Sequence, residues 1–205
     1  LALPLLSIEA FEATQGSCNL VLGANGVGKS TLLRLLAGKH MVSSGSIQLL
    51  GKKPFQDSLD QTQVSLVSGV FPLNIDLEVS ELVAAARKRP EYGGDALLGE
   101  LETLLEVDPK WRMHTVSSGQ RRRVDLLLAL LVKPKVLLLD EVTSDLDLLC
   151  RQNLLIWLKK NAQKSGMTVL LATHILDRLD QWADQILVLG FGKVLFQGVF
   201  HSTLH

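Results

Sequence analysis

The sequence has few cysteines, few aromatic residues and no excess of charge of either sign. Its two cysteines, Cys18 and Cys150, are too few for a disulfide framework or a cysteine metal cluster, so reduced thiols are expected. Lys and Arg number 21 and Asp and Glu number 21, which gives a formal net charge of zero in 205 residues. This balance argues against a protein whose whole surface binds nucleic acid or acidic membranes.

Long apolar segments are also missing, although 47% of the residues are hydrophobic and mean hydropathy is +0.24. The apolar runs at 126–132 and 186–189 are far shorter than the roughly 20 residues that a bilayer crossing needs. The first six residues are apolar but lack a basic leader and a cleavage site, so they do not resemble a signal peptide. We therefore expect a soluble, cytoplasmic protein with a sizeable core, and a nuclear pool is compatible with this.

Short apolar runs alternate with longer helical patterns along the chain, which is typical of a mostly parallel sheet covered by helices. Helices are predicted at 29–37 and 147–164, and strands are predicted at 19–22, 46–50, 63–67, 136–139, 168–172, 185–189 and 193–196. The runs at 136–139 and 168–172 are apolar throughout, as in strands that are buried on both faces. The predicted fold class is therefore α/β.

A more polar, helical stretch interrupts this alternation in the middle of the chain. Pro90 and the glycines at 93 and 94 divide it into parts. We predict one domain over 1–205, in which 1–69 and 117–205 form the catalytic α/β core and 70–116 is an inserted helical subdomain.

A glycine-rich loop follows the first predicted strand and precedes the first predicted helix. It fits G-x-x-x-x-G-K-[ST], and its residues, with the threonine that follows, are Gly23, Ala24, Asn25, Gly26, Val27, Gly28, Lys29, Ser30 and Thr31. Such a loop points backbone N–H groups into one concavity at a positive helix end. Lys29 supplies charge for the β- and γ-phosphates, and Ser30 offers a hydroxyl ligand to Mg²⁺. Binding of a nucleoside triphosphate is predicted.

Two carboxylates follow the apolar run at 136–139. Asp140 stands at the predicted strand end, where it would hold Mg²⁺ through water, and Glu141 stands where a base polarises an attacking water. Taken alone, two acids after a strand fit a solvated turn equally well. Together with the phosphate loop they favour a P-loop NTPase.

A helix start that is also an anion site is predicted at 117–120. Ser117 and Gln120 have the capping-box spacing, and Ser118 and Gly119 lie between them. Three arginines follow at 121–123. Because neighbouring residues of a helix point about 100° apart, these arginines do not form one face for nucleic acid, and packing or solvation is favoured.

The chain resembles the ATP-binding-cassette (ABC) ATPases along essentially its whole length. Residues 116–120, Val-Ser-Ser-Gly-Gln, resemble the family's signature sequence, usually Leu-Ser-Gly-Gly-Gln. Residues 143–147 resemble the D-loop, and Thr173-His174 resembles the switch histidine that contacts the γ-phosphate. The resemblance implies catalytic roles for Lys29, Glu141 and His174, metal binding by Ser30 and Asp140, and nucleotide contacts from Ser117, Ser118, Gly119, Gln120 and Asp145.

The family resemblance also implies an architecture and an assembly. It implies a P-loop NTPase of the ABC nucleotide-binding type, with a mostly parallel core sheet, a small antiparallel β part and a helical subdomain. Two ABC domains, identical or different, would pair head to tail. The phosphate loop of one domain would then face the signature residues of the other across ATP.

A closer resemblance is to the soluble eukaryotic ABC ATPases that have no membrane domain. Residues 111–124, 140–147 and 172–175 resemble the plant non-intrinsic class I proteins and the fungal factor associated with the carbon-catabolite-repressor–Not complex. Val142 stands where most transporter ATPases have proline. The glutamine that most ABC ATPases have at a strand end after the phosphate loop is missing at Ser68-Gly69, with Asn74 the nearest substitute.

The function that these resemblances imply is Mg²⁺-dependent binding and hydrolysis of ATP by a dimerising ATPase that drives a protein partner, in transcription or mRNA regulation. The alternative is the ATPase subunit of a transporter whose membrane chains are encoded separately. A scaffold that binds nucleotide and hydrolyses little is less favoured, because Glu141 and His174 are both present. No direct contact with nucleic acid is expected.

Overall fold

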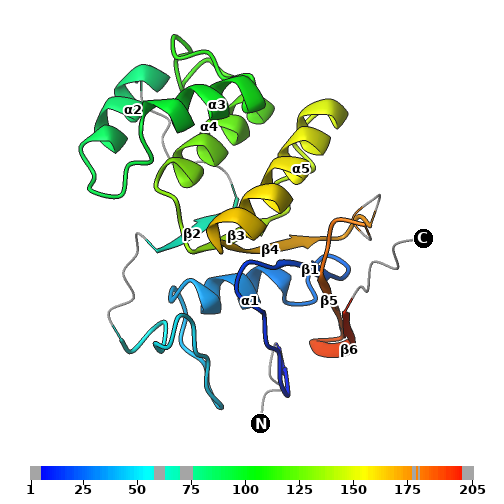
Figure 1. Cartoon of the computed structure of the whole chain (residues 1–205). Helices are drawn as coiled ribbons and strands as arrows, with labels where there is room; N and C mark the ends of the chain where they lie inside the picture. The colour runs from blue at the N-terminus through cyan, green and yellow to red at the C-terminus, as the bar shows by residue number, and fades with distance from the viewer. Residues whose placement is uncertain (1–5, 58–62, 70–75, 177–178, 180, 200–205) are drawn as a thin grey trace.

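A computed structural model of the chain describes residues 6–57, 63–69, 76–176, 179 and 181–199 (Figure 1). Its strands are β1 (Cys18–Leu22), β2 (Val64–Val67), β3 (Val136–Asp140), β4 (Thr168–Thr173), β5 (Gln185–Gly190) and β6 (Lys193–Val199). Its helices are α1 (Lys29–Leu36), α2 (Val79–Arg87), α3 (Asp95–Leu105), α4 (Ser118–Leu131) and α5 (Leu148–Ser165).

The six strands form one sheet in the order β2-β3-β4-β1-β5-β6. The strands β2, β3, β4, β1 and β5 pair in parallel, and β6 pairs with β5 in the antiparallel direction after a turn at Phe191-Gly192. Because β1 and β3 both pair with β4 in parallel, the carboxyl ends of these three strands lie at one edge of the sheet. This confirms the predicted α/β class with a mostly parallel sheet and a small antiparallel part.

Helices cover both faces of the sheet. In Figure 1, α1 lies on one side, α4 and α5 lie on the other, and α2 and α3 lie beyond α4. Side chains of β3 alternate between the two cores: Leu138 packs with Leu33 of α1, whereas Leu137 and Leu139 pack with the helices of the other side. The apolar run at 136–139 is therefore buried on both faces, as its composition predicts.

Helices α2 and α3 lie between residues 76 and 116 and pack with α4 rather than on the sheet. Each boundary has a local cause. Glu78 and Glu81 form a capping box at the start of α2, and Glu106 ends α3 in a left-handed conformation. The division of the chain into a core and a subdomain at 70–116 remains a prediction, since residues 70–75 lie outside the described part.

The strand predicted at 46–50 is wrong. Residues 46–48 have no regular structure, and Leu49 forms only an isolated antiparallel bridge with Lys52. The cause is the backbone that follows, because Leu50 (φ 53°) and Gly51 (φ 76°) are left-handed and turn the chain back at once. The apolar alternation at 46–50 is therefore not sufficient for a strand, because the backbone turns at Leu50 and Gly51.

Both cysteines are buried and free, so the expectation of unpaired thiols is confirmed. Burial raises the pKa of the Cys18 thiol to about 12, against a lowering effect from Lys159. Among the described residues, no helix combines the length and the apolar character that crossing a membrane requires.

Candidate functional site

The loop between β1 and α1 is built by glycines that no other residue could replace without strain. Gly26 has φ 82° and Gly28 has φ 110°, both in the left-handed region. A Cβ on Gly23 would lie 2.6 Å from the carbonyl oxygen of Leu189, so this end of the loop lies directly against β5. Gly28 is the N-cap of α1 and no side chain caps it, which leaves the first backbone N–H groups of the helix available to an anion.

Lys29 is buried at the first position of α1 and is fully paired. Its exposed fraction is 5%, and its Nζ donates to the carbonyl oxygens of Gly23 (2.8 Å) and Ala24 (3.1 Å). The same Nζ lies 3.0 Å from Oε1 of Glu141. An unpaired ammonium at this depth would be costly, so Glu141 and the loop carbonyls compensate its charge.

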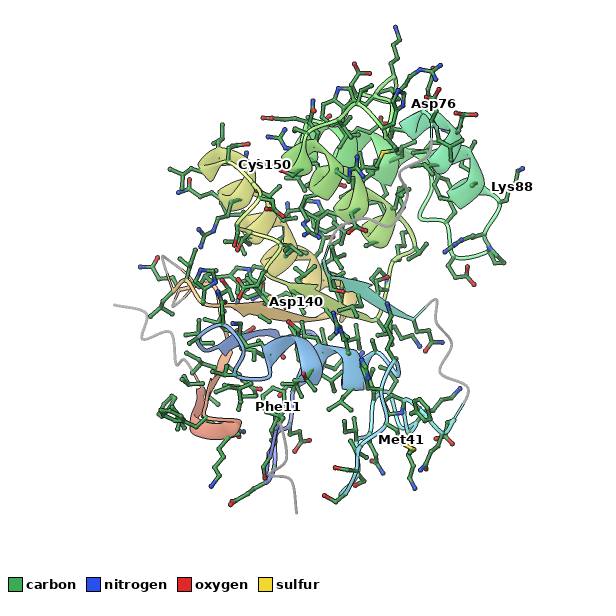
Figure 2. All side chains as sticks on the ribbon, turned by 180° about the vertical axis from the view of Figure 1, so that it is seen from behind. Phe11, Met41, Asp76, Lys88, Asp140 and Cys150 are labelled. Carbon is green, nitrogen blue, oxygen red and sulfur yellow. The ribbon has the colours of Figure 1, made fainter. Side chains whose placement is uncertain are left out.

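Ser30 and Asp140 come together from residues that are 110 positions apart. The hydroxyl of Ser30 on α1 donates to Oδ1 of Asp140 at the end of β3, over 3.0 Å. Asp140 lies at the sheet, between the helices of the two faces (Figure 2), and is 7% exposed. Two hard oxygen donors thus sit beside the phosphate loop, which is the donor type that Mg²⁺ prefers together with phosphate oxygens.

Glu141 follows β3 in a left-handed conformation, with φ 54°. Its backbone N–H donates to the carbonyl of Ala172 on β4 (2.9 Å), and its Oε2 lies 3.0 Å from Nδ1 of His174. Burial would raise the pKa of the Glu141 carboxyl, but hydrogen bonds and charge from Lys29 and His174 outweigh burial and lower it. A non-glycine residue with positive φ costs energy and is common at functional sites.

The structure therefore brings all of the predicted catalytic and metal residues into one cluster. Lys29 and His174 contact the two carboxylate oxygens of Glu141, and Ser30 contacts Asp140, which is the residue before it. Ala24, Asn25 and Gly26 form the exposed rim of the loop, and Val27 and Thr31 are half-buried.

The second group of predicted residues surrounds the start of α4. Ser117 is the N-cap: its hydroxyl accepts from the backbone N–H of Gln120 (3.2 Å), and the Gln120 side chain accepts from the N–H of Ser117 (2.9 Å). This capping box matches the prediction from their spacing. The helix end opens into a hollow of about 480 Å³ lined by Trp111, Ser117, Gly119, Gln120, Arg123, Asp145 and Asp147.

The D-loop packs against this helix end. A Cβ on Gly119 would lie 2.8 Å from the carbonyl oxygen of Asp145, so the two backbones are in close contact. Asp145 accepts from Nε of Arg122 (3.1 Å), and Asp147 caps α5 by accepting from the N–H of Cys150 (3.0 Å). None of the residues that line the hollow belongs to the phosphate loop. The chain thus carries two separate groups of site residues.

The three consecutive arginines are each paired within the chain. Arg121 donates to the carbonyl of Met113 (2.8 Å), and Arg122 pairs with Asp145. Arg123 pairs with Glu106 (2.7 Å) and with Asp147. The sequence pattern predicts only packing or solvation for these arginines. No short-range pattern links Arg122 to an aspartate 23 residues away.

Two further features are not part of this cluster: His114, which the sequence predicts only as a packing residue of the helical part, and the end of β2. Nδ1 of His114 is 2.9 Å from Oδ1 of Asp76, which lies among α2 to α4, far from Asp140 (Figure 2). Strand β2 ends at Val67 and is followed by Ser68 and Gly69, without the glutamine that most ABC ATPases have. Asn74, its nearest substitute, lies outside the described residues.

Sequence comparison finds one family and several curated relatives. The profile of the "ABC transporter" family matches residues 7–144. "ABC transporter I family member 20" of Arabidopsis thaliana is 37% identical over 202 residues, covering 91% of this chain and 60% of the relative. "CCR4-associated factor 16" of Saccharomyces cerevisiae is 38% identical over 200 residues, covering 86% and 66%. The chain thus spans 60% and 66% of the length of these two relatives.

Bacterial import proteins and solved structures are also similar. "Sulfate/thiosulfate import ATP-binding protein CysA" of Synechococcus elongatus is 36% identical over 184 residues, covering 87% of this chain and 54% of the relative. A dimeric ATP-binding cassette solved in a post-hydrolysis state with ADP and Pi superposes with a TM-score of 0.79. That comparison covers 94% of this chain and 89% of the other at 22% identity, so it shows a shared fold.

Proposed function

Because this chain belongs to the ABC transporter family of ATP-binding and ATP-hydrolysing domains, we propose that it is a Mg²⁺-dependent ATPase that closes as a head-to-tail dimer on ATP. The observation that carries this proposal is the cluster of Lys29, Glu141 and His174 beside the Ser30–Asp140 pair, directly at the phosphate loop. These contacts place all five residues within one small volume beside the loop.

Binding of the triphosphate would rest on the backbone of the phosphate loop and on Lys29. The uncapped N-terminus of α1 offers N–H groups and a positive dipole end to the phosphates. Lys29 would turn from Glu141 to the β- and γ-phosphates, whose charge it would then balance. Asn25 and Thr31 complete the loop and the first turn of the helix.

Ser30 and Asp140 would hold Mg²⁺, Asp140 through water. Their oxygens already lie 3.0 Å apart, and bound Mg²⁺ would neutralise charge on the β- and γ-phosphates. Glu141 would orient and polarise the attacking water, because it is the only carboxylate that the structure places against both Lys29 and His174 among the described residues. His174 would contact the γ-phosphoryl group that is transferred.

A second copy, or another ABC domain, would complete the site. The capped start of α4, formed by Ser117, Ser118, Gly119 and Gln120, opens into its own hollow together with Asp145 and lies apart from the phosphate loop of the same chain. Its N–H groups would therefore reach the γ-phosphate that a partner domain binds. The solved relative with the same fold is a dimer by its title, which supports this arrangement.

The test of this function is phosphate release from ATP by the purified chain. We expect hydrolysis with Mg²⁺, none with EDTA in excess of the metal, and a loss of about 100-fold or more in Lys29→Ala, because the phosphate charge is then unbalanced. The variant Lys39→Ala, an exposed lysine ten residues further on, serves as the control. ATP that remains intact after long incubation with a protein that binds it would favour the scaffold alternative.

We further propose that the ATP cycle drives a protein partner in the cytoplasm, with a nuclear pool, in transcription or mRNA regulation. Support comes from the yeast relative, whose name states an association with CCR4. Affinity purification of Glu141→Gln with Mg-ATP, compared with Lys29→Ala, would retain partners specific to the closed state. A polytopic membrane protein in that fraction would instead favour the transporter subunit, which the bacterial import relative supports.

A further inference from the structure

Arg122 is the most deeply buried of the three consecutive arginines and links helix α4 to the D-loop. It lies in the first turns of α4 with 9% of its side chain exposed. Its Nε and Nη2 both lie 3.1 Å from Oδ2 of Asp145, and its Nη1 lies 3.5 Å from Oδ2 of Asp125. This buried guanidinium directs two of its nitrogens at one carboxylate oxygen of Asp145 and has a weaker contact with Asp125, which restricts its orientation.

The backbones of the start of α4 and the D-loop are also in close contact, in addition to the ion pair. The Gly119 backbone approaches the Asp145 carbonyl so closely that a Cβ on Gly119 would lie at 2.8 Å. Both residues line the hollow at the start of α4. Asp145 is therefore held against the start of α4 twice, by its side chain through Arg122 and by its backbone carbonyl beside Gly119.

We propose that the Arg122–Asp145 ion pair is a positioning pair that sets the D-loop against the signature residues before ATP arrives. The two elements then present one preformed surface to the ATP held by a second ABC domain. This inference rests on the proposed head-to-tail dimer. It gives Arg122 a role in closure of the dimer and none in the binding of ATP by its own phosphate loop, from which the hollow is separate.

Three single substitutions separate this role from simple packing. Arg122→Gln and Asp145→Asn remove one charge each and keep the side chains close in size. Arg121→Gln is the matched control, because Arg121 is the neighbouring arginine of the same helix and donates to the Met113 carbonyl instead of the D-loop. In Arg122→Gln and Arg121→Gln, binding of a fluorescent ATP analogue to the monomer should equal that of the wild type.

Dimer formation is the decisive readout. With Glu141→Gln as the background and Mg-ATP present, light scattering should show dimerisation weakened by about tenfold in Arg122→Gln and in Asp145→Asn. The double variant should lose no more than either single one, because the pair acts as a unit. Arg122→Lys keeps the charge but has one nitrogen in place of the two that face Asp145, and it should recover part of the loss.

The outcomes are distinct. Additive losses in the double variant, or dimerisation at the wild-type level in Arg122→Gln, would overturn the positioning role. Weaker dimerisation of equal size in Arg121→Gln would show general damage to α4 and would overturn it as well. If the Glu141→Gln background itself stays monomeric with saturating Mg-ATP, the head-to-tail dimer fails, and the inference fails with it for a separate and visible reason.

Discussion

Helices α1 and α4 both begin at loops that are predicted to meet phosphate, but their first turns are arranged differently. At α1 the N-cap is Gly28 with φ 110°, and no side chain occupies the N–H groups. At α4 the hydroxyl of Ser117 and the amide of Gln120 already take up two backbone N–H groups. Beside α1 stands the buried Lys29, whereas the arginines of α4 are all paired within the chain.

This difference indicates that the two helix ends have different roles in binding the nucleotide. The end of α1 is open and flanked by a cation, so it can bind an anion by itself. The end of α4 uses two of its N–H groups in its own cap and has its arginines paired elsewhere, so it would gain less from free phosphate. It becomes useful when another domain delivers a bound nucleotide to it, and the following predictions test this contrast from the largest effect to the smallest.

The largest effect is expected for Glu141→Gln. Loss of the group that polarises water should lower kcat by about 100- to 10,000-fold, while ATP binding at α1 persists. Since the closed state is then no longer consumed, light scattering should show an ATP-dependent dimer. An ATP turnover rate within a few-fold of the wild type would remove Glu141 from the catalytic role.

A mixing experiment tests whether the two helix ends act on one ATP. Lys29→Ala disables the α1 end, and Gly119→Val disables the α4 end, because a Cβ on Gly119 would meet the Asp145 carbonyl at 2.8 Å. Mixed dimers contain one intact composite site, so an equimolar mixture of these two inactive variants should recover about a quarter of wild-type turnover. Each variant mixed with itself is the control. If no activity returns, the composite site is contradicted.

The next effect concerns stability as a function of pH at α4. Burial, opposed by Arg122 and Lys39, raises the pKa of Asp125 to about 6. Protonation of Asp125 therefore adds stability that is full below about pH 4, the unfolded pKa, and is lost as pH rises through 6. In urea unfolding at pH 4, 6 and 8, Asp125→Asn should gain about 1–3 kcal/mol relative to the wild type toward pH 8. A difference that stays constant with pH would contradict this.

The smallest effect is expected for the cap of α4. Ser117→Ala removes the acceptor for the Gln120 N–H and should cost about 1 kcal/mol, or a Tm lower by roughly 2–4 °C. Ser118→Ala, at the next and exposed position, should change Tm little. Calorimetry measures both. Equal shifts would mean that the capping box does not stabilise the start of α4.

Local patterns were sufficient to predict much of the fold and several site residues. The phosphate loop, the buried strands β3 and β4 and the capping box at Ser117 are all encoded within a few neighbouring residues, because their geometry depends on local backbone and side-chain chemistry. The parallel sheet followed from the alternation of strands and helices. These features could be predicted since each has a short-range cause.

Contacts between distant positions could not be predicted in this way. Glu141 lies between Lys29 and His174, which are 112 and 33 positions away in the sequence. The residues next to Glu141 in the sequence do not predict its φ of 54°. The Arg122–Asp145 pair depends equally on how α4 and the D-loop pack. The strand predicted at 46–50 fails for the opposite reason, because Leu50 and Gly51 override a favourable local pattern.

The pairing of Lys29 with Glu141 has a consequence for the timing of the proposed reaction. Each is the counter-ion of the other, and the bond to Lys29 helps to keep the pKa of Glu141 low. If Lys29 turned to the triphosphate as proposed, Glu141 would lose the partner that lowers its pKa. Binding of the substrate would thus raise the basicity of the carboxylate that is proposed to polarise the attacking water.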